Sequence, residues 1–180
     1  MIEPMLIGAK SVVERGDYWL SRGYNNKGQP VVLTREQRGT HQAHTGYETF
    51  EFNEWLTPIL REYVDNNFFA SDRGIVKTQE FYLWYEAGAG ISLHADDSTA
   101  NVLQAVYRVV TVLLYLNDDY EGGEISFPAH DLTLKPSPGD LLIFPGNKSF
   151  KHVVDPIISG HRYAIMQTYD LPLLTNCCPQ

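Results

Sequence analysis

The last hundred or so residues alternate between short apolar segments and turn-forming residues, and this pattern limits the folds open to the chain. About eight segments are rich in Val, Ile, Leu, Tyr and Phe and are separated by Gly, Pro, Asn and Asp; they cover residues 78–85, 90–94, 108–116, 124–127, 131–134, 140–144, 151–154 and 162–169. Short segments of this composition are typical of β-strands. Their number and spacing predict a mainly β (α+β) domain with a sandwich or jelly-roll core.

The residues before these strands have a different pattern. Residues 53–67 are predicted to form a helix, because five apolar side chains recur at helical spacing: Leu56, Ile59, Leu60, Tyr63 and Val64. Either Asn53 is expected to cap its start, or Thr57 caps it with Pro58 in the first helical position. Residues 1–50 are expected to form strands and loops, with a long polar loop over 21–46 of the kind that often acts as a lid.

The length of 180 residues suits one domain. We expect residues 1–180 to form a single unit, in which a helical and loop layer over about 1–76 packs against a jelly-roll core over about 77–170. Hydrophobic residues make up 43% of the chain and charged residues 20%, as in ordinary globular proteins. A chain of this length buries most of its apolar surface without disulfides.

The net charge of −8 and the pI of about 5.1 argue against a general nucleic-acid binder, because an acidic surface repels phosphate backbones. Such a surface accepts a neutral or basic peptide. Glu3 and Pro4 interrupt the N-terminal segment, and no apolar run approaches the length of a membrane span, so neither a signal peptide nor a membrane anchor is expected. Cys177 and Cys178 are adjacent and form no disulfide framework, which favours the cytoplasm. The oligomeric state stays open.

Three residues have the chemistry and spacing of a metal site. His94 and Asp96 lie two residues apart in LHADDS, and His152 follows about 60 residues later in FKHVVDP. Side chains at i and i+2 of an extended chain point to the same side, so His94 and Asp96 can meet one ion. Two histidines and one carboxylate suit non-haem Fe(II), whereas zinc usually takes four ligands, often with sulfur. A His-x-Asp pair also occurs by chance, and a hydrogen-bonded structural pair is the alternative.

Arg162 follows His152 by ten residues, with turn-forming residues at 155–156 and 159–160. This spacing allows one strand to end, turn and return beside itself. A guanidinium is a planar fork that binds a carboxylate through two parallel hydrogen bonds, so Arg162 can hold the far carboxylate of a dicarboxylic acid whose other end chelates iron. A surface arginine in a salt bridge is the alternative. On a strand over 162–169, small and medium side chains share its face and leave room for it: Ala164, Met166 and Thr168.

Two tyrosines are candidates for the same site. Tyr115, in VTVLLYLND, shares a strand face with Thr111, Leu113 and Asn117. A buried tyrosine usually finds a partner for its hydroxyl, and a carboxylate held by Arg162 would be one. Tyr85 can project into the same space from the first core strand. Packing in an aromatic core is the alternative for both, and for Tyr85 alone the residues favour packing.

Four motifs, found in one order, carry a family resemblance: YEAGAGISLHAD, RVVTVLLYLNDDYEGGEISFP, LTLKPSPGDLLIFPG and HVVDPIISGHRY. Over about 90 residues, 82–168, the chain resembles the prolyl 4-hydroxylase branch of the 2-oxoglutarate- and Fe(II)-dependent oxygenases, in its compact microbial or viral form. The resemblance places the iron ligands on His94, Asp96 and His152. It places the residue that binds the distal carboxylate of 2-oxoglutarate on Arg162, and two site tyrosines on Tyr115 and Tyr85.

The resemblance implies a fold and a reaction. The fold is the double-stranded β-helix, a jelly roll, in agreement with the strand pattern. The reaction uses 2-oxoglutarate and O2 to hydroxylate a C–H bond and yields succinate and carbon dioxide, with Fe(II) as the metal and ascorbate as a further candidate cofactor. A protein or peptide substrate with proline is implied, as in procollagen-proline 4-dioxygenase, together with the cytoplasm of a microbe or of a virus-infected host cell.

Other functions stay open at this point. The chain could hydroxylate a non-proline residue, a small molecule or a nucleobase, although RYAIMQTYD lacks the second arginine of the superfamily's repair demethylases. A jelly roll that binds metal without catalysis and serves as an interaction module is an alternative of another class. The first 70 residues do not match the family well, and four residues there are candidates for a substrate groove: Tyr24, Arg35, Arg38 and Tyr47.

The remaining histidines are expected to lie outside the metal site. His41 and His44 have the spacing of one helical face, but no third ligand is close in sequence, so a polar loop near substrate is preferred. His161 adjoins Arg162 and would face the opposite way on a strand, and His130 lies at a predicted turn.

Overall fold

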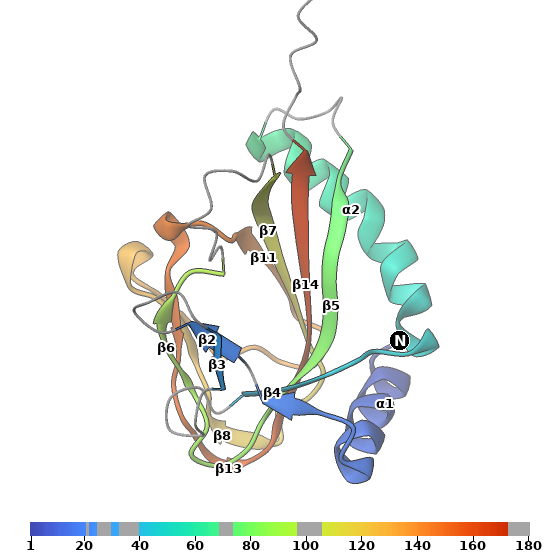
Figure 1. Ribbon diagram of the computed structural model, residues 1–180, viewed down its shortest axis with the longest axis vertical. Coiled ribbons are helices and arrows are strands. Elements are labelled where there is room, and N and C mark those ends of the chain that lie inside the picture. Colours follow the sequence, from blue (N-terminus) through green and yellow to red (C-terminus); the bar gives the residue numbers. More distant parts are fainter. Residues whose placement is uncertain (21, 25–29, 33–39, 69–73, 97–105, 173–180) are drawn as a thin grey trace, which may run out of the picture.

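A computed structural model of the chain describes residues 1–20, 22–24, 30–32, 40–68, 74–96 and 106–172. Most of these residues form antiparallel β-sheets, and two helices lie against one of the sheets (Figure 1). The predicted mainly β architecture, with a helical layer from the N-terminal part, is confirmed. Each of the eight predicted strands corresponds to a strand of the structure, with ends that differ by at most three residues.

The larger sheet has six strands, in the order β1 (Trp19–Leu20), β4 (Thr40–Ala43), β5 (Val76–Tyr85), β14 (Arg162–Pro172), β7 (Val106–Tyr115) and β11 (Leu141–Pro145). All neighbours are antiparallel. Side chains along a strand alternate between its two faces. In β14, Tyr163 and Ile165 face the helices while Ala164 and Met166 face the opposite way, which is the alternation predicted for residues 162–169.

The smaller sheet has four strands, in the order β10 (Leu132–Leu134), β9 (Ile125–Phe127), β12 (His152–Val154) and β6 (Ile91–His94). It packs on the larger sheet through a buried core cluster, which we call the inter-sheet core. The larger sheet contributes Leu83, Leu113 and Ala164 to it, among others, and the smaller sheet contributes Ile125 and Val154. Two short pairs complete the strands: β8 (Tyr120–Gly122) with β13 (Ile157–Gly160), and β2 (Arg22–Tyr24) with β3 (Pro30–Val32).

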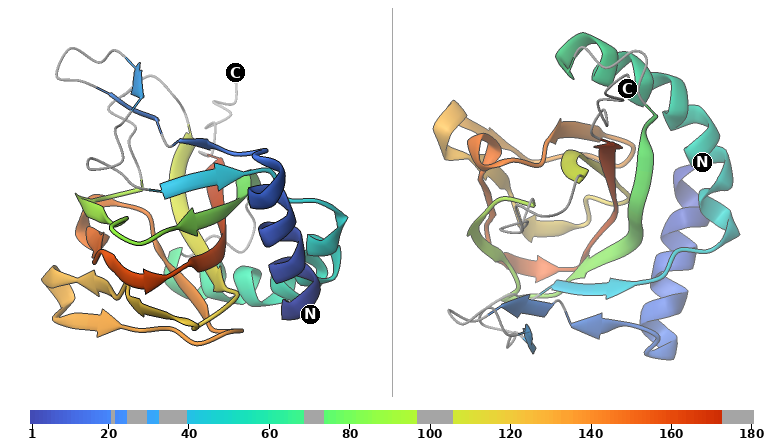
Figure 2. Two further views of the ribbon diagram at one scale, coloured as in Figure 1. Left: turned by 90° about the horizontal axis from the view of Figure 1, so that it is seen from below. Right: turned by 45° about the horizontal axis from the view of Figure 1, so that its top comes forward.

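Two helices, α1 (Ile2–Arg15) and α2 (Phe50–Phe68), cover the other face of the larger sheet (Figures 1 and 2). Buried side chains recur every three or four residues on each helix: Met5, Ala9 and Val12 on α1, and Phe52, Leu56, Leu60 and Val64 on α2. Each fully buried Leu or Phe side chain contributes about 1.5–3 kcal/mol. In the part of the chain that the structure describes, no helix combines the length and apolar character needed to cross a membrane.

Helix α1 corrects the expectation that residues 1–50 contain only strands and loops. Pro4 lies in its first turn, where the missing N–H has no helical partner in any case, so proline is tolerated there. Gly16 ends the helix in the left-handed conformation with φ of 73°. The polar segment 21–46 also contains β2, β3 and β4 rather than one uninterrupted loop.

The predicted helix over 53–67 is confirmed, but both proposed starts are wrong. A 3₁₀ turn, η1 (Tyr47–Thr49), leads directly into α2 at Phe50, so Asn53 and Pro58 both lie inside the helix. The Thr57 hydroxyl donates to the Asn53 carbonyl at 2.7 Å instead of capping a helix start. Local sequence favoured these caps, but the chain enters the helix earlier.

The pair β8 and β13 was not predicted from the sequence. Tyr120–Gly122 form β8, and residues 159–160, which were expected to form a turn, instead end β13. Segments of three and four residues are too short for a periodic pattern, so only their mutual pairing defines them as strands. Two further 3₁₀ turns, η2 (Pro128–His130) and η3 (Lys148–Phe150), connect the neighbouring strands.

A carboxylate on β5 ties the larger sheet to the start of α2. The Glu80 carboxylate accepts hydrogen bonds from Thr45 at 2.6 Å, Thr49 at 2.8 Å and Gln167 at 2.7 Å, and Lys77 donates to it at 2.5 Å. Burial opposes ionisation of this group. The bonds from Lys77 and the two threonines outweigh burial and hold the pKa of Glu80 below its usual range.

The lowered pKa of Glu80 predicts a pH-dependent contribution to stability. Because the folded-state pKa lies below the unfolded value of 4.5, the contribution is present above about pH 4.5 and is lost as pH falls through the folded pKa. Glu80→Gln is expected to lower the free energy of unfolding at pH 7 by about 1–3 kcal/mol and to flatten its decline in acid. Urea titrations at several pH values measure both effects. The exposed Glu51→Gln is the control, and an equally steep acid decline in both variants would contradict the assignment.

Candidate functional site

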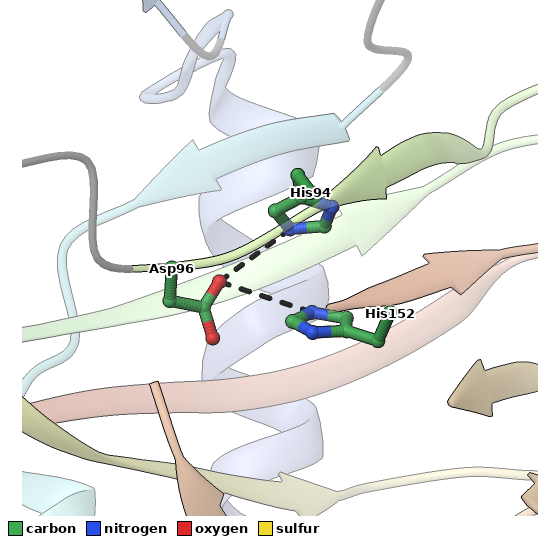
Figure 3. A group of neighbouring side chains, drawn as sticks. All are labelled: His94, Asp96 and His152. Atoms are coloured by element: carbon green, nitrogen blue, oxygen red, sulfur yellow. Dashed lines mark ion pairs between the residues drawn. The ribbon is translucent and has the colours of Figure 1, made fainter. Parts of the chain in front are cut away.

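Two histidines and one aspartate converge at the end of the smaller sheet, as Figure 3 shows. His94 ends β6, Asp96 follows two residues later, and His152 begins β12 directly opposite His94 in the strand register. The Asp96 Oδ1 atom lies 3.4 Å from His94 Nε2 and 3.8 Å from His152 Nε2. One ligand atom from each residue lies within 4.8 Å of the others, which is close enough for one ion to contact all three.

Backbone carbonyls orient both imidazoles toward this common point. His94 Nδ1 lies 2.9 Å from the Ser92 carbonyl, and His152 Nδ1 lies 3.2 Å from the Phe150 carbonyl. A carbonyl oxygen only accepts, so each Nδ1 carries the proton. In a protonated ring Nε2 donates to Asp96, whereas in a neutral ring Nε2 has the lone pair that a metal would accept. Hydrogen bonds from Nδ1 to backbone carbonyls are typical of metal-binding histidines.

The Asp96 side chain is 7% exposed. Burial alone would raise its pKa, but the hydrogen bond from His94, the charge of His152 and a hydrogen bond from Thr111 lower the pKa of Asp96 below its usual range. The carboxylate is therefore an anionic ligand. The rings of Phe127 and Phe144 lie 5.4 Å and 5.1 Å from the His152 ring and shield that side from water.

Thr111 connects the larger sheet to the triad. It lies on β7, is fully buried, and donates from its hydroxyl to Asp96 Oδ2 at 2.7 Å, which leaves Oδ1 directed at the two histidines. The sequence placed Thr111 on the face of Tyr115 but gave no sign of this contact. The hydrogen bond joins β7 of the larger sheet to the bend that follows β6 of the smaller sheet, and only the folded structure brings the two residues together.

Arg162, the first residue of β14, is fully buried in the inter-sheet core. Its guanidinium lies 4.8 Å from the ring centres of Tyr85 and Tyr115. Nη1 donates to the Gly123 carbonyl at 3.0 Å, and Nη2 donates to the Tyr115 hydroxyl at 3.1 Å. The Nε–H has no partner, and among the described residues no carboxylate forms an ion pair with Arg162.

A buried cation without an anionic partner is costly, so this arrangement favours an anionic ligand at Arg162. The neighbouring Tyr120 hydroxyl is also buried without a partner. Burial raises the pKa of the Tyr115 phenol against the lowering effect of Arg162, so the hydroxyl keeps its proton and can donate it to a ligand. Unused donors thus meet at one end of the inter-sheet core.

The Gly123 carbonyl accepts the hydrogen bond from Arg162 Nη1 at this end of the inter-sheet core. The φ of Gly123 is 72°, and a Cβ added there would lie 2.4 Å from Ile157 Cδ1, so both backbone conformation and space require glycine. Nothing in the sequence indicated that Gly123 contacts Arg162. Their contact depends on the pairing of β8 with β13 and on the position of β14 beside them.

The chain does not take the route from His152 to Arg162 that the spacing allowed. The strand does not turn and return beside itself, because β12 belongs to the smaller sheet and β14 to the larger one, with β13 between them in sequence. Arg162 instead lies directly opposite Tyr85 of β5, and Ala164, two residues further along β14, lies opposite Tyr115 of β7. The candidate co-substrate residues therefore come from three adjacent strands that face the triad's sheet across the inter-sheet core.

The structure gives three of the four other histidines packing roles. His41 is not in a polar loop but in β4, where it stacks on Trp84 with ring centres 4.4 Å apart and contacts Glu86 at 3.3 Å. The His161 ring stacks on Trp84, on the side of the sheet opposite to Arg162. His130, in the turn η2, stacks on Phe150 of the turn η3. The triad is the only candidate metal cluster among the described residues.

The candidate substrate-groove residues give little information. Tyr47 is 99% exposed on η1. The described residues do not include Arg35, Arg38, Cys177 and Cys178. For Tyr24 the structure describes only the backbone. Their predicted roles stay predictions.

Comparisons with known proteins agree with this geometry. The family model of the 2OG-Fe(II) oxygenase superfamily matches residues 81–169, a range that contains all six candidate site residues. A search of curated protein sequences finds no significant match. Solved structures with the same fold include three prolyl hydroxylases.

The first is a prolyl hydroxylase from Trichoplax adhaerens in complex with a hypoxia inducible factor peptide, with a TM-score of 0.70, 23% identity, and coverage of 93% of this chain and 77% of that one. The viral collagen prolyl hydroxylase of Paramecium Bursaria Chlorella virus-1 has a TM-score of 0.64, 20% identity, and coverage of 91% and 90%. A Pseudomonas putida prolyl-4-hydroxylase has a TM-score of 0.67, 17% identity, and coverage of 93% and 84%.

These likenesses confirm the jelly-roll fold, and the family implies Fe(II) and 2-oxoglutarate. The residues present fit both groups. Two imidazoles whose Nε2 atoms converge on one anionic carboxylate are a donor set that suits Fe(II) with open positions. The unpaired Nε–H of Arg162 suits a carboxylate. The chain belongs to the 2OG-Fe(II) oxygenase superfamily, as a dioxygenase that resembles the compact prolyl 4-hydroxylases.

Proposed function

We propose that the chain is a 2-oxoglutarate- and O2-dependent hydroxylase of peptidyl proline. One observation carries the proposal: a His-Asp-His donor set and a buried arginine without an anionic partner adjoin the same inter-sheet core. The first can hold a metal and the second a dicarboxylic acid, so together they specify a co-substrate that spans the two. A site for a metal alone would not need Arg162.

His94, Asp96 and His152 would hold the iron through their Nε2 and Oδ1 atoms. Bound there, Fe(II) supplies the O2 chemistry that converts 2-oxoglutarate to succinate and carbon dioxide and adds one oxygen atom to the substrate C–H bond. The carbonyls of Ser92 and Phe150 keep both rings in the ligating tautomer. The protein's own contribution is to fix these ligands and to shield them.

Arg162 would bind the distal carboxylate of 2-oxoglutarate. Its Nη1 is anchored on Gly123, so the unpaired Nε–H and the remaining Nη protons are free to donate. Tyr115 accepts from Nη2 and therefore has its own hydroxyl proton available for the same carboxylate. Tyr85 packs its ring against the guanidinium and limits the guanidinium's movement. Ascorbate is a proposed additional reductant.

The proline assignment rests on resemblance. A structural neighbour was solved with a hypoxia inducible factor peptide, and others are described as collagen prolyl hydroxylase and prolyl-4-hydroxylase. The net charge of −8 suits a neutral or basic peptide. We further propose that residues 1–180 act as one domain, in which about 1–76 support the core and shape substrate entry.

Two measurements test the proposed function. With Fe(II) and 2-oxoglutarate alone, an enzyme of this class produces succinate slowly, whereas a non-catalytic binding module produces none. Incubation with proline-rich peptides is then expected to add one oxygen atom at proline, located by fragment mass spectrometry, and matched peptides with alanine in place of proline are the control. Oxygen added only at other residues would retain the oxygenase and reject the proline assignment.

Thr111 offers a test of how the metal ligands are supported. Thr111→Val keeps the side-chain shape but removes the donor to Asp96 Oδ2, so the carboxylate loses the bond that orients it. We expect Fe(II) affinity to fall by about 10–100-fold, which is usual when a hydrogen bond that orients a metal ligand is lost. Anaerobic Fe(II) titration measures the affinity. Thr111→Ser retains the hydroxyl and should stay near wild type, and equal affinities of all three proteins would contradict this role.

A further inference from the structure

The side chain of Asn117 continues the larger sheet beyond the end of β7. The strand ends at Tyr115, and the Leu116 N–H donates to the Tyr163 carbonyl at 3.0 Å. At the next position the Asn117 amide replaces the backbone. Its Oδ1 accepts from the Tyr163 N–H at 2.7 Å, and its Nδ2 donates to the His161 carbonyl at 2.6 Å. The side chain thus reproduces the donor and acceptor of a peptide group.

These contacts bracket one residue of β14. His161 and Tyr163 are the two neighbours of Arg162, and both bond to the same amide. On the other edge of the strand, Arg162 itself pairs with Tyr85 of β5. The backbone around Arg162 is therefore held on one edge by β5, and on the other edge by the Asn117 side chain together with the Leu116 N–H.

The orientation of the Asn117 amide is fixed by its partners. Nδ2 donates to the His161 carbonyl and to the Asp119 carboxylate, both of which only accept, while Oδ1 faces a backbone N–H, which only donates. A reversed amide would lose all three bonds. Because Asn117 is only 4% exposed, water does not readily replace them.

We propose that Asn117 is a positioning residue for 2-oxoglutarate, which acts by fixing the backbone of Arg162 so that the guanidinium meets the distal carboxylate. The proposal rests on the function proposed above. Arg162 lacks an ion-pair partner among the described residues, and its side chain has only two hydrogen bonds to keep it in place. The position of its charge therefore depends strongly on the backbone from which it extends.

The experiment compares two ligands under anaerobic conditions with Fe(II) bound. 2-Oxoglutarate has a distal carboxylate, whereas oxalate chelates metal through two adjacent carboxylates and has no distal arm to reach Arg162. Asn117→Ala is expected to raise the Kd of 2-oxoglutarate by roughly 10–100-fold, because a misplacement of about 1 Å has effects of this size. The Kd of oxalate and of Fe(II) should not change.

A double substitution separates positioning from general stability. If Asn117 acts through Arg162, Asn117→Ala adds no further loss of 2-oxoglutarate affinity in an Arg162→Met protein. Asn147→Ala is the matched control, since the Asn147 side chain accepts only from Ser149 within the turn η3 and should leave both ligands unaffected. Asn117→Ser keeps a hydroxyl that can retain one of the bonds, so it should give an intermediate Kd. If circular dichroism shows that Asn117→Ala does not fold, Asn117→Ser takes its place in the comparison.

The outcomes distinguish the inference from the proposed function. Equal weakening of 2-oxoglutarate and oxalate, additive losses in the double variant, or an unchanged Kd in both Asn117 variants would overturn the positioning role. If the Arg162→Met variant instead binds 2-oxoglutarate as tightly as the wild-type protein does, the proposed co-substrate site itself is rejected.

Discussion

Replacing His94 or His152 by alanine is expected to abolish the conversion of 2-oxoglutarate to succinate while the fold survives. Each substitution removes one of only three ligand atoms that lie within 4.8 Å of one another. Loss of a bond that merely orients a ligand already costs about 10–100-fold, so loss of the ligand itself should reduce turnover beyond about 100-fold. Both side chains lie near the end of the smaller sheet, away from the core between the larger sheet and the two helices.

Three measurements on each histidine variant make the result decisive. Succinate formation reports turnover, anaerobic titration reports Fe(II) affinity, and thermal unfolding without metal reports whether the fold is intact. His44→Ala, an exposed histidine after β4, is the control and should behave as wild type. Wild-type succinate formation by either triad variant with iron present would show that the ligand assignment is wrong.

The second large effect is expected at Arg162. Arg162→Met should weaken 2-oxoglutarate binding by about 1.5–3 kcal/mol or more, which is the range for a hydrogen bond to a charged group. Fold stability without ligand should change little or even increase, because a buried guanidinium without an anionic partner costs desolvation free energy that an apolar side chain of similar volume does not. Loss of affinity without loss of stability is the signature of a charge kept for a ligand.

Arg162→Lys is a useful companion variant. It retains the positive charge but loses the planar fork, so it should bind 2-oxoglutarate with an affinity between those of wild type and Arg162→Met. Arg15→Met on the exposed end of α1 controls for the loss of a positive charge. An unchanged apparent affinity in Arg162→Met would assign the carboxylate anchor to another residue, and a collapse of stability would make Arg162 a structural residue.

The site could be predicted from sequence to the extent that it is local. His94 and Asp96 converge because a two-residue spacing fixes the face of an extended chain. Likewise Arg162 faces inward with Ala164 because alternation within β14 decides it. The family motifs then supplied His152, whose distance in sequence gives no geometric information. Helix α1 was missed because residues 1–50 were assigned to strands and loops, although Met5, Ala9 and Val12 recur at helical spacing.

The sequence by itself determined the strand pattern, the face on which each candidate residue lies and the chemical types at the site. Only the tertiary structure decided which strands are neighbours, and the reason is physical. Periodicity is a property of one segment, whereas pairing depends on contacts between segments far apart in the chain. For this reason the sequence suggested that Arg162 returns beside His152, while the fold places it on the opposite sheet. The supporting contacts of Thr111, Gly123 and Asn117 were decided in the same way.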